Sequence, residues 1–105
     1  MAIVFEHKGT QYTLEYTRDA VRRLEANGFS LDKAGDMPVT SLLVLFRGAF
    51  MAHHPRTSQA TIDEIWEGLG NKDGIFEALA TLYNEPIEAL MKEPDEGEKI
   101  VWRVK

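Results

Sequence analysis

The chain has 105 residues, 44% of them apolar and 28% charged, and its net charge is −5. This length is enough for one domain, residues 1–105, with a single hydrophobic core, and the composition is ordinary for a globular protein. The acidic balance argues against sequence-independent binding of nucleic acid and against attraction to an anionic membrane, because both require clustered lysine and arginine. The absence of cysteine excludes disulfide and thiolate chemistry. The N-terminal residues lack the basic and long apolar regions of a signal peptide, so we expect a soluble, cytoplasmic protein.

Residues 2–16 have the pattern of a β-hairpin with one apolar face. Large apolar side chains recur at every second position on either side of a turn at residues 8–9: Ile3, Phe5, Tyr12, Leu14 and Tyr16. Such alternation around a glycine-containing turn is typical of two antiparallel strands. Since an isolated hairpin is only marginally stable, its apolar face is expected to rest on other elements.

Three helices are predicted from capping residues and from apolar positions at helical spacing. Thr17 is expected to cap a first helix of about ten residues, which Gly28 ends in a left-handed conformation. Ser58 and Asn71 are expected to cap two later helices. The last of these contains Pro86 and is predicted to be a kinked helix or two abutting helices, because proline removes a backbone donor.

The longest apolar stretch, residues 39–54, is predicted as a central helix, preceded by a turn or single helical turn at residues 30–37. Pro38 provides a rigid entry, and Pro55 prevents continuation beyond residue 54. At about 100° per residue, its polar side chains form one narrow stripe: Thr40, Arg47 and His54. A helix with so little polar surface is expected to be central in the fold, or to be completed by a partner.

Four apolar residues flank this polar stripe and are the candidate partner-binding residues. Leu43 and Phe50 lie on one flank, and Val44 and Met51 lie on the other. Either neighbouring helices cover both flanks, or one flank is an exposed apolar patch. An exposed patch of this kind would mark a protein-binding surface.

The last residues of the chain alternate again, with Ile100, Trp102 and Val104 on one side. This pattern predicts a strand, for which the N-terminal hairpin is the available partner. The predicted fold is therefore α+β. Four or five helices around the central helix pack on a small antiparallel sheet formed by the N-terminal hairpin and the C-terminal strand.

No group of residues has the spacing of a catalytic or metal site. His53 and His54 are adjacent, so on a helix their side chains point about 100° apart, whereas zinc-binding pairs on a helix are spaced by four residues. We interpret His53 as a core or helix-end residue and His54 as a solvated one. Asp63, Glu64 and Glu67 are interpreted as a solvated helix face. No catalytic residue, metal ion or cofactor is predicted, and an interaction module is favoured over an enzyme.

The order of several short motifs adds a further indication. After the hairpin the chain carries, in sequence, Thr17-Arg18, Val21, Glu25, Gly28-Phe29, Pro38-Val39-Thr40, Leu45-Phe46, Gly48-Ala49-Phe50, His53-His54, Tyr83-Asn84-Glu85-Pro86 and Ala89-Leu90. Taken together, and over nearly the whole chain, this series resembles the small tail assembly chaperones of long-tailed, siphovirus-type bacteriophages and of prophages in Gram-positive bacteria.

The resemblance implies a role in virion assembly without enzymatic activity. Proteins of this kind bind the helical tape measure protein, keep it soluble and help tail tube subunits polymerise around it in the host bacterial cytoplasm. They are not expected in the mature virion. In many such phages a ribosomal frameshift adds a C-terminal extension to part of the product, and this sequence shows no such extension.

An amphipathic tape measure helix would need an apolar groove, and the flanks Leu43/Phe50 and Val44/Met51 are where we expect it. The partners implied are the tape measure protein and the tail tube protein, and repeated binding along a long partner would favour homo-oligomers. The alternative is a small cytoplasmic phage or bacterial enzyme or regulator whose site is assembled from scattered residues. A pocket joining His53, His7 and carboxylates would favour that alternative.

Overall fold

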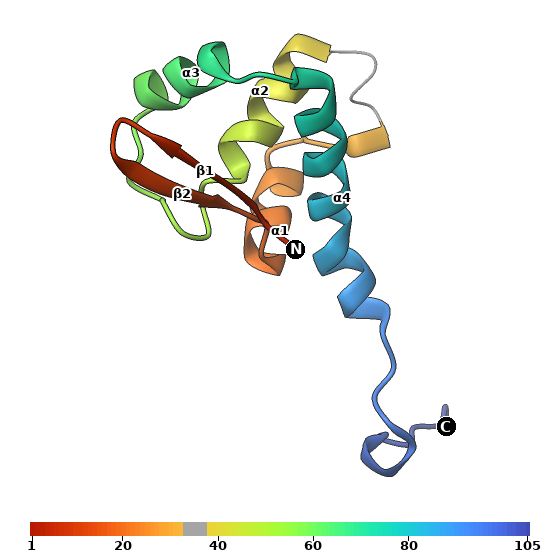
Figure 1. Ribbon diagram of the computed structural model, residues 1–105. Coiled ribbons are helices and arrows are strands. Elements are labelled where there is room, and N and C mark those ends of the chain that lie inside the picture. The colour runs from red at the N-terminus through yellow and green to blue at the C-terminus, as the bar shows by residue number, and fades with distance from the viewer. Residues whose placement is uncertain (33–37) are drawn as a thin grey trace.

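The computed structural model describes residues 1–32 and 38–105. Within these residues the chain forms two antiparallel strands and four α-helices (Figure 1), which confirms the predicted α+β class and agrees with the predicted four or five helices. The elements are β1 (Ile3–His7), β2 (Thr10–Leu14), α1 (Arg18–Ala26), α2 (Pro38–Gly48), α3 (Gln59–Gly68), α4 (Lys72–Met91) and the short 3-10 helix η2 (Glu96–Glu98). Part of the turn predicted at residues 30–37, namely residues 33–37, lies outside the described residues. No helix in the described part of the chain is long and apolar enough to cross a membrane.

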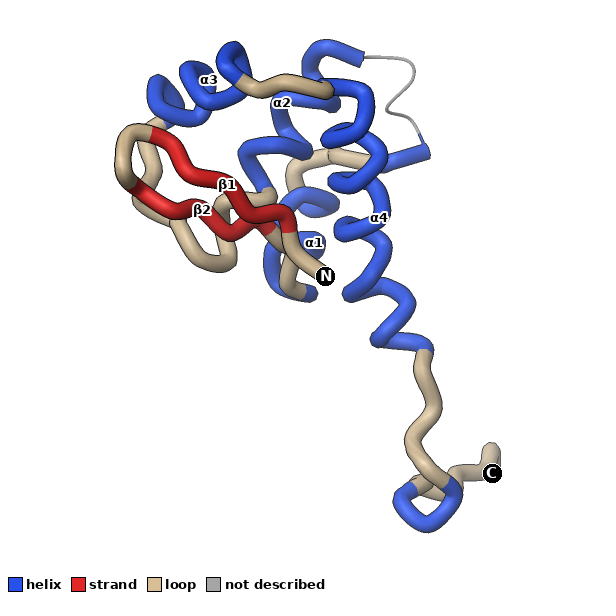
Figure 2. The backbone as a smooth tube through the Cα atoms, in the orientation of Figure 1, coloured by secondary structure: helices blue, strands red, loops and turns tan. Residues whose placement is uncertain are grey.

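The N-terminal hairpin forms as predicted. Strands β1 and β2 pair antiparallel, from Ile3 opposite Leu14 to His7 opposite Thr10. Lys8 and Gly9 both have positive φ angles, 49° and 80°, as a two-residue type I′ turn requires. The hairpin lies beside α2 and α1 (Figures 1 and 2), and its inner face contributes to the core.

The helix caps predicted from the sequence are confirmed. The Ala20 amide donates to Thr17 Oγ1 at 3.1 Å, and the equivalent side-chain caps are made by Ser58 and Asn71. Helix α1 stops at Gly28, which has a φ of 90°. The amide of Phe29 then donates back to the Leu24 carbonyl at 3.0 Å, a bond typical of a glycine-terminated helix.

Helix α2 is shorter than predicted, because it ends at Gly48 and not at residue 54. Beyond Gly48 the chain forms turns. In them the backbone amides of Phe50 and Met51 donate to the carbonyls three residues earlier, those of Arg47 and Gly48. The Glu15 amide, just after β2, donates to the Ala49 carbonyl at 3.2 Å. This tertiary bond uses a carbonyl that a longer helix would need for itself, so the continuous helix over residues 39–54 is replaced by a helix and a tight turn.

Helix α4 is a single continuous helix that runs through Pro86, so a description as two abutting helices is wrong. Proline cannot donate to the carbonyl of Leu82, one turn earlier. In the preceding turns two side chains donate to backbone carbonyls of the helix: the Thr81 hydroxyl to that of Glu77, and the Asn84 side-chain amide to that of Ala80. Beyond Pro86 the helix continues to Met91 and projects from the domain (Figure 1).

The predicted C-terminal strand is not present in the sheet, which has two strands, β1 and β2. Ile100, Trp102 and Val104 are 90%, 78% and 87% exposed, and their backbone has no strand structure. The tail lies away from the hairpin (Figure 2). Two features account for this: α4 carries the chain outward, and the acidic segment with Pro94 that follows contains no apolar residue to fold back onto the domain.

The core joins the hairpin to α1, α2, α3 and α4. Its fully buried large side chains are Leu14, Leu45, Phe46, Phe50, Leu79 and Leu82. Tyr16 lies at the centre, packed edge-on against Tyr83, and its hydroxyl donates to the Leu45 carbonyl at the end of α2. Burial, with a smaller contribution from Tyr83, raises the pKa of Tyr16 well above its usual value.

The buried hydroxyl of Tyr16 generates a prediction for stability at alkaline pH. The unfolded chain loses tyrosine protons near pH 10, at about the free tyrosine pKa, while the folded chain keeps the proton of Tyr16. Its contribution to stability is therefore complete below about pH 10 and is lost as the pH rises further. Tyr16→Phe should flatten this alkaline decrease, although Tyr83, whose pKa burial also raises, still contributes.

The same substitution should also lower the free energy of unfolding at neutral pH by about 0.5–1.5 kcal/mol, because the buried Leu45 carbonyl loses one of its two donors and keeps only the Ala49 amide. Urea unfolding at a series of pH values measures both effects. Identical alkaline slopes for the wild type and Tyr16→Phe would contradict the assignment.

Candidate partner-binding groove

An open groove of about 640 Å³ lies between α1, α2 and the turn that follows α2. Apolar side chains from these elements and from α3 line it: Leu24, Val44, Phe50, Met51 and Ile62. The groove is therefore built from segments that are distant in the sequence and are brought together by packing of α1 on α2.

Gly48 allows the close approach of the two helices beneath the groove. A Cβ atom at Gly48 would lie 2.7 Å from Leu24 Cδ1, nearer than carbon atoms approach without displacement. The glycine therefore lets the end of α2 lie directly against Leu24 of α1. The turn that starts at Gly48 then leads Met51 and His54 along the groove.

The charged residues of the groove are all basic. Arg23 and Arg47 line it, and no aspartate or glutamate in residues 1–32 or 38–105 does. Arg23 Nε is paired with Asp19 Oδ2 at 3.0 Å, whereas Arg47 forms no ion pair with any residue in the described ranges. In a protein of net charge −5, this gives the groove a local charge opposite to that of the whole chain.

The structure separates the four candidate residues of the central stretch. Val44 and Met51 are half-buried and line the groove, as expected for one flank of the polar stripe. Leu43 is 40% exposed but does not line the groove.

Phe50 was a candidate on the flank that it shares with Leu43, which could be either covered by neighbouring helices or exposed, and the structure buries it. Its side chain is only 2% exposed, and its ring packs against Phe46 and Tyr12 at centroid distances of 5.1 and 5.9 Å. Residues seven apart lie on the same side of a helix only while the helix continues. Because α2 ends at Gly48, Phe50 does not share a side with Leu43. Phe50 therefore supports the groove from the core.

Sequence reasoning missed the two arginines of the groove. Arg47 was visible only as part of a polar stripe, in a pattern that also fits a solvated helix face. Nothing in the sequence connects Arg23 with Arg47, because their proximity depends on how α1 packs on α2.

The two adjacent histidines have roles opposite to those expected. His54 is half-buried, and its Nε2 accepts a hydrogen bond from the Thr13 amide at 3.0 Å, while its ring lies against Tyr12. His53 is exposed and is paired with Glu15. The reason is again the end of α2, since in the turn the two side chains no longer follow helical directions.

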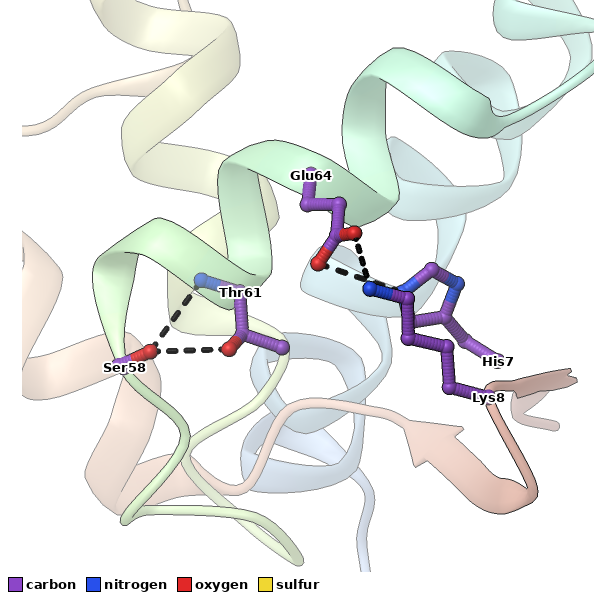
Figure 3. A network of polar contacts seen from close by, with 5 residues as sticks. All are labelled: His7, Lys8, Ser58, Thr61 and Glu64. Carbon is purple, nitrogen blue, oxygen red and sulfur yellow. Dashed lines mark hydrogen bonds and ion pairs between the residues drawn. The ribbon is translucent and has the colours of Figure 1, made fainter.

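The third histidine belongs to a polar network at the hairpin turn (Figure 3). Lys8 Nζ lies 2.5 Å from Glu64 Oε1, and this hydrogen bond lowers the pKa of the Glu64 carboxyl. His7 Nε2 is 3.6 Å from Glu64 Oε2, which is within ion-pair range but beyond hydrogen-bond distance. The network holds the hairpin turn against α3. Among the described residues, no group of three or more His, Cys, Asp or Glu side chains is arranged to bind a metal ion.

A shallow hollow next to the groove contains His53, His54, Ser58 and Thr61. Ser58 Oγ accepts the Thr61 amide as the cap of α3, and His54 accepts the Thr13 amide. Both side chains are thus used to hold backbone groups, and they are not paired with each other as a nucleophile and a base would be.

The contrast between the two histidines can be tested. His54→Ala should lower the free energy of unfolding by about 1–3 kcal/mol, because the partly buried Thr13 amide loses its acceptor. His53→Ala should change it by less than about 0.5 kcal/mol, as expected for an exposed residue in a surface pair. Urea unfolding of both variants at neutral pH measures the difference, and equal losses would contradict the assigned roles.

Comparison with known proteins places the whole chain in one family. No curated protein and no solved structure matches it. A family model described as a domain of unknown function, DUF5055, matches residues 1–105, which is every residue of the sequence. The chain therefore belongs to the DUF5055 family.

Proposed function

We propose that this DUF5055 protein is a non-enzymatic tail assembly chaperone of a long-tailed bacteriophage or prophage. In this role it binds the helical tape measure protein in the host cytoplasm, keeps it soluble and assists assembly of the tail tube around it. The observation that carries the proposal is the groove between α1 and α2, which combines an apolar lining with basic residues on an acidic protein.

The shape of the groove supports a helical ligand. Recognition of an amphipathic helix needs an apolar channel that receives side chains from one face of the ligand. Val44 and Met51 lie in the groove and are only half-buried, so they have surface left for a partner to cover. Methionine suits this purpose because its flexible, polarisable side chain adapts to different apolar neighbours.

The charge of the groove narrows the chemistry of the ligand. Arg23 and Arg47 line the groove, and none of the carboxylates that the structure describes does. A helix with acidic residues beside its apolar stripe would therefore be preferred over a basic one, since like charges at an interface oppose association. We assign the groove to acidic amphipathic segments of the tape measure protein.

The motifs that resemble the chaperone family agree with this assignment. Gly48 and Phe50, from the Gly48-Ala49-Phe50 motif, and His54, from the His53-His54 motif, all line the groove. Gly48 permits the helix packing, Phe50 supports the lining from the core, and His54 ties the end of the turn to β2.

The apolar part of the proposal is tested with labelled peptides that tile a tape measure protein of the phage or prophage that carries the gene. Met51→Asp should weaken binding about tenfold or more, equivalent to about 1.4 kcal/mol, because it places a carboxylate in the apolar channel. Leu43→Asp is the matched control, since Leu43 is similarly accessible but lies outside the groove. Fluorescence anisotropy measures affinity, and circular dichroism checks that both variants are folded.

Equal affinities of folded Met51→Asp and Leu43→Asp for every peptide would reject the groove as the binding site. If no peptide binds the wild-type protein either, the proposed function itself is contradicted.

The charge preference is tested separately by Arg47→Glu. Binding of acidic peptides should weaken, and the residual affinity should depend less on salt concentration, because an attractive charge has been replaced by a repulsive one. Arg56→Glu makes the same change in net charge outside the groove and should have a smaller effect. Equal effects of the two substitutions would show that only the overall charge of the protein matters.

A further inference from the structure

The outer edge of β1 has unused backbone hydrogen-bonding groups. In a hairpin closed by a two-residue turn, the pair that flanks the turn exchanges hydrogen bonds, and the pattern then alternates. Here that pair is His7 and Thr10, so the amide and carbonyl groups of Val4 and Glu6 point away from β2. None of them takes part in a hydrogen bond with any residue in the described ranges.

The opposite edge of the hairpin is occupied at its C-terminal end, at Thr13 and Glu15. On β2 the outward amide of Thr13 donates to His54 Nε2, and the amide of Glu15 donates to the Ala49 carbonyl. The turn after α2 therefore blocks the C-terminal end of the β2 edge, and β1 provides the edge along which the sheet could be extended.

On the inner face of the hairpin, the side chains of β1 are less buried than those of β2. Tyr12 and Leu14, the inner residues of β2, are 8% and 0% exposed. Their partners on β1, Ile3 and Phe5, are only half-buried. A further strand beside β1 would supply the apolar cover that these two side chains lack.

One segment of this chain has the properties of such a strand. In the tail, Ile100, Trp102 and Val104 occupy alternate positions, so they would share one side of a strand, and all three are exposed. Of the chain's 12 basic and 17 acidic side chains, residues 99–105 hold three of the basic and none of the acidic ones, so residues 1–98 carry a net charge of −8. Charge complementarity therefore favours docking of this tail on the body of the same protein.

The connection between α4 and the tail favours docking on a second copy over docking on the same one. The last turns of α4 project away from the domain and carry the tail with them (Figure 1). The connecting residues 92–98 contain four carboxylates, from Glu93, Asp95, Glu96 and Glu98. Folding this segment back would bring it along the acidic end of α4, near Glu85 and Glu88, where like charges repel.

We propose that the C-terminal segment of one copy adds as a third strand to the β1 edge of a second copy. Placing Trp102 beside Phe5 in a parallel register brings Arg103 next to Glu6 on the solvent side and Ile100 next to Ile3 on the inner side. Reciprocal exchange closes a symmetric dimer, and exchange with successive copies forms a larger assembly. This inference does not depend on the proposed binding of a tape measure protein.

Complementation between two variants tests the exchange. Trp102→Asp disables the tail, and because Trp102 is exposed in the single chain, it should leave the folded domain intact. Val4→Pro disables the edge by removing the outward amide of Val4, a change that edge strands tolerate. Each variant alone should be monomeric, and a mixture should form 1:1 dimers, because an intact tail then meets an intact edge. Val101→Asp, on the solvent side of the added strand, is the control that should still self-associate.

Analytical ultracentrifugation over a concentration series measures these states. A wild-type protein that stays monomeric would overturn the proposal, whether its tail is free or docked on its own β1 edge. So would an assembly that Trp102→Asp leaves unchanged, or a mixture of the two variants that remains monomeric.

A cross-link tests the same contact without a proline. The chain has no cysteine, so Val4→Cys in one copy and Val101→Cys in another provide two defined thiols. Gentle oxidation of the mixture should give a disulfide between the two chains, identified by mass. In the control mixture Thr13→Cys replaces Val4→Cys. Thr13 is the partner of Val4 on β2, the covered strand, so this mixture should give much less of the disulfide-linked dimer. Equal yields from the two mixtures would contradict docking at β1.

Discussion

A contact between the end of β2 and the end of α2 positions the hairpin on the helices. Tyr16 donates its hydroxyl to the Leu45 carbonyl, and the Glu15 amide donates to the Ala49 carbonyl. These bonds join a hairpin, which is marginal alone, to the most apolar helix of the chain. The bond from Glu15 also uses the Ala49 carbonyl, which a longer α2 would need for itself, and the helix gives way to a turn at Gly48. A buried polar contact thus sets both where the sheet lies and where the helix ends.

The groove forms because α2 ends at Gly48. If α2 had continued to residue 54, Phe50 would share a flank with Leu43. The turn instead places Phe50 in the core and directs Met51 and His54 along the space between α1 and α2. Gly48 keeps the two helices close below this space, and Arg23 and Arg47 give it a charge opposite to that of the protein. An apolar channel with basic residues is suited to an acidic amphipathic helix, which is the chemistry we propose for the partner.

The hairpin has an open strand edge, and the tail has exposed apolar side chains that a neighbouring strand could cover. The covered edge of β2 belongs to the contact with α2 described above, whereas β1 keeps open backbone groups and two half-buried apolar side chains. The tail has strand-like alternation and exposed apolar residues but no neighbour. Because α4 continues through Pro86 and projects from the domain, the two are held apart within one chain. Separation within a chain and complementarity between chains are the conditions under which strand exchange occurs.

The local features could be predicted from neighbouring residues alone: the hairpin with its turn at Lys8 and Gly9, the caps at Thr17, Ser58 and Asn71, the stop at Gly28 and the α+β class. These depend on neighbouring residues, for which side-chain capping, positive φ angles and periodicity are sufficient signals. The end of α2 at Gly48, the burial of Phe50, the exchanged roles of His53 and His54, and the position of the tail were decided only by the tertiary structure. Each depends on a contact between segments distant in the chain, or on its absence, and helical periodicity carries no information about such a contact.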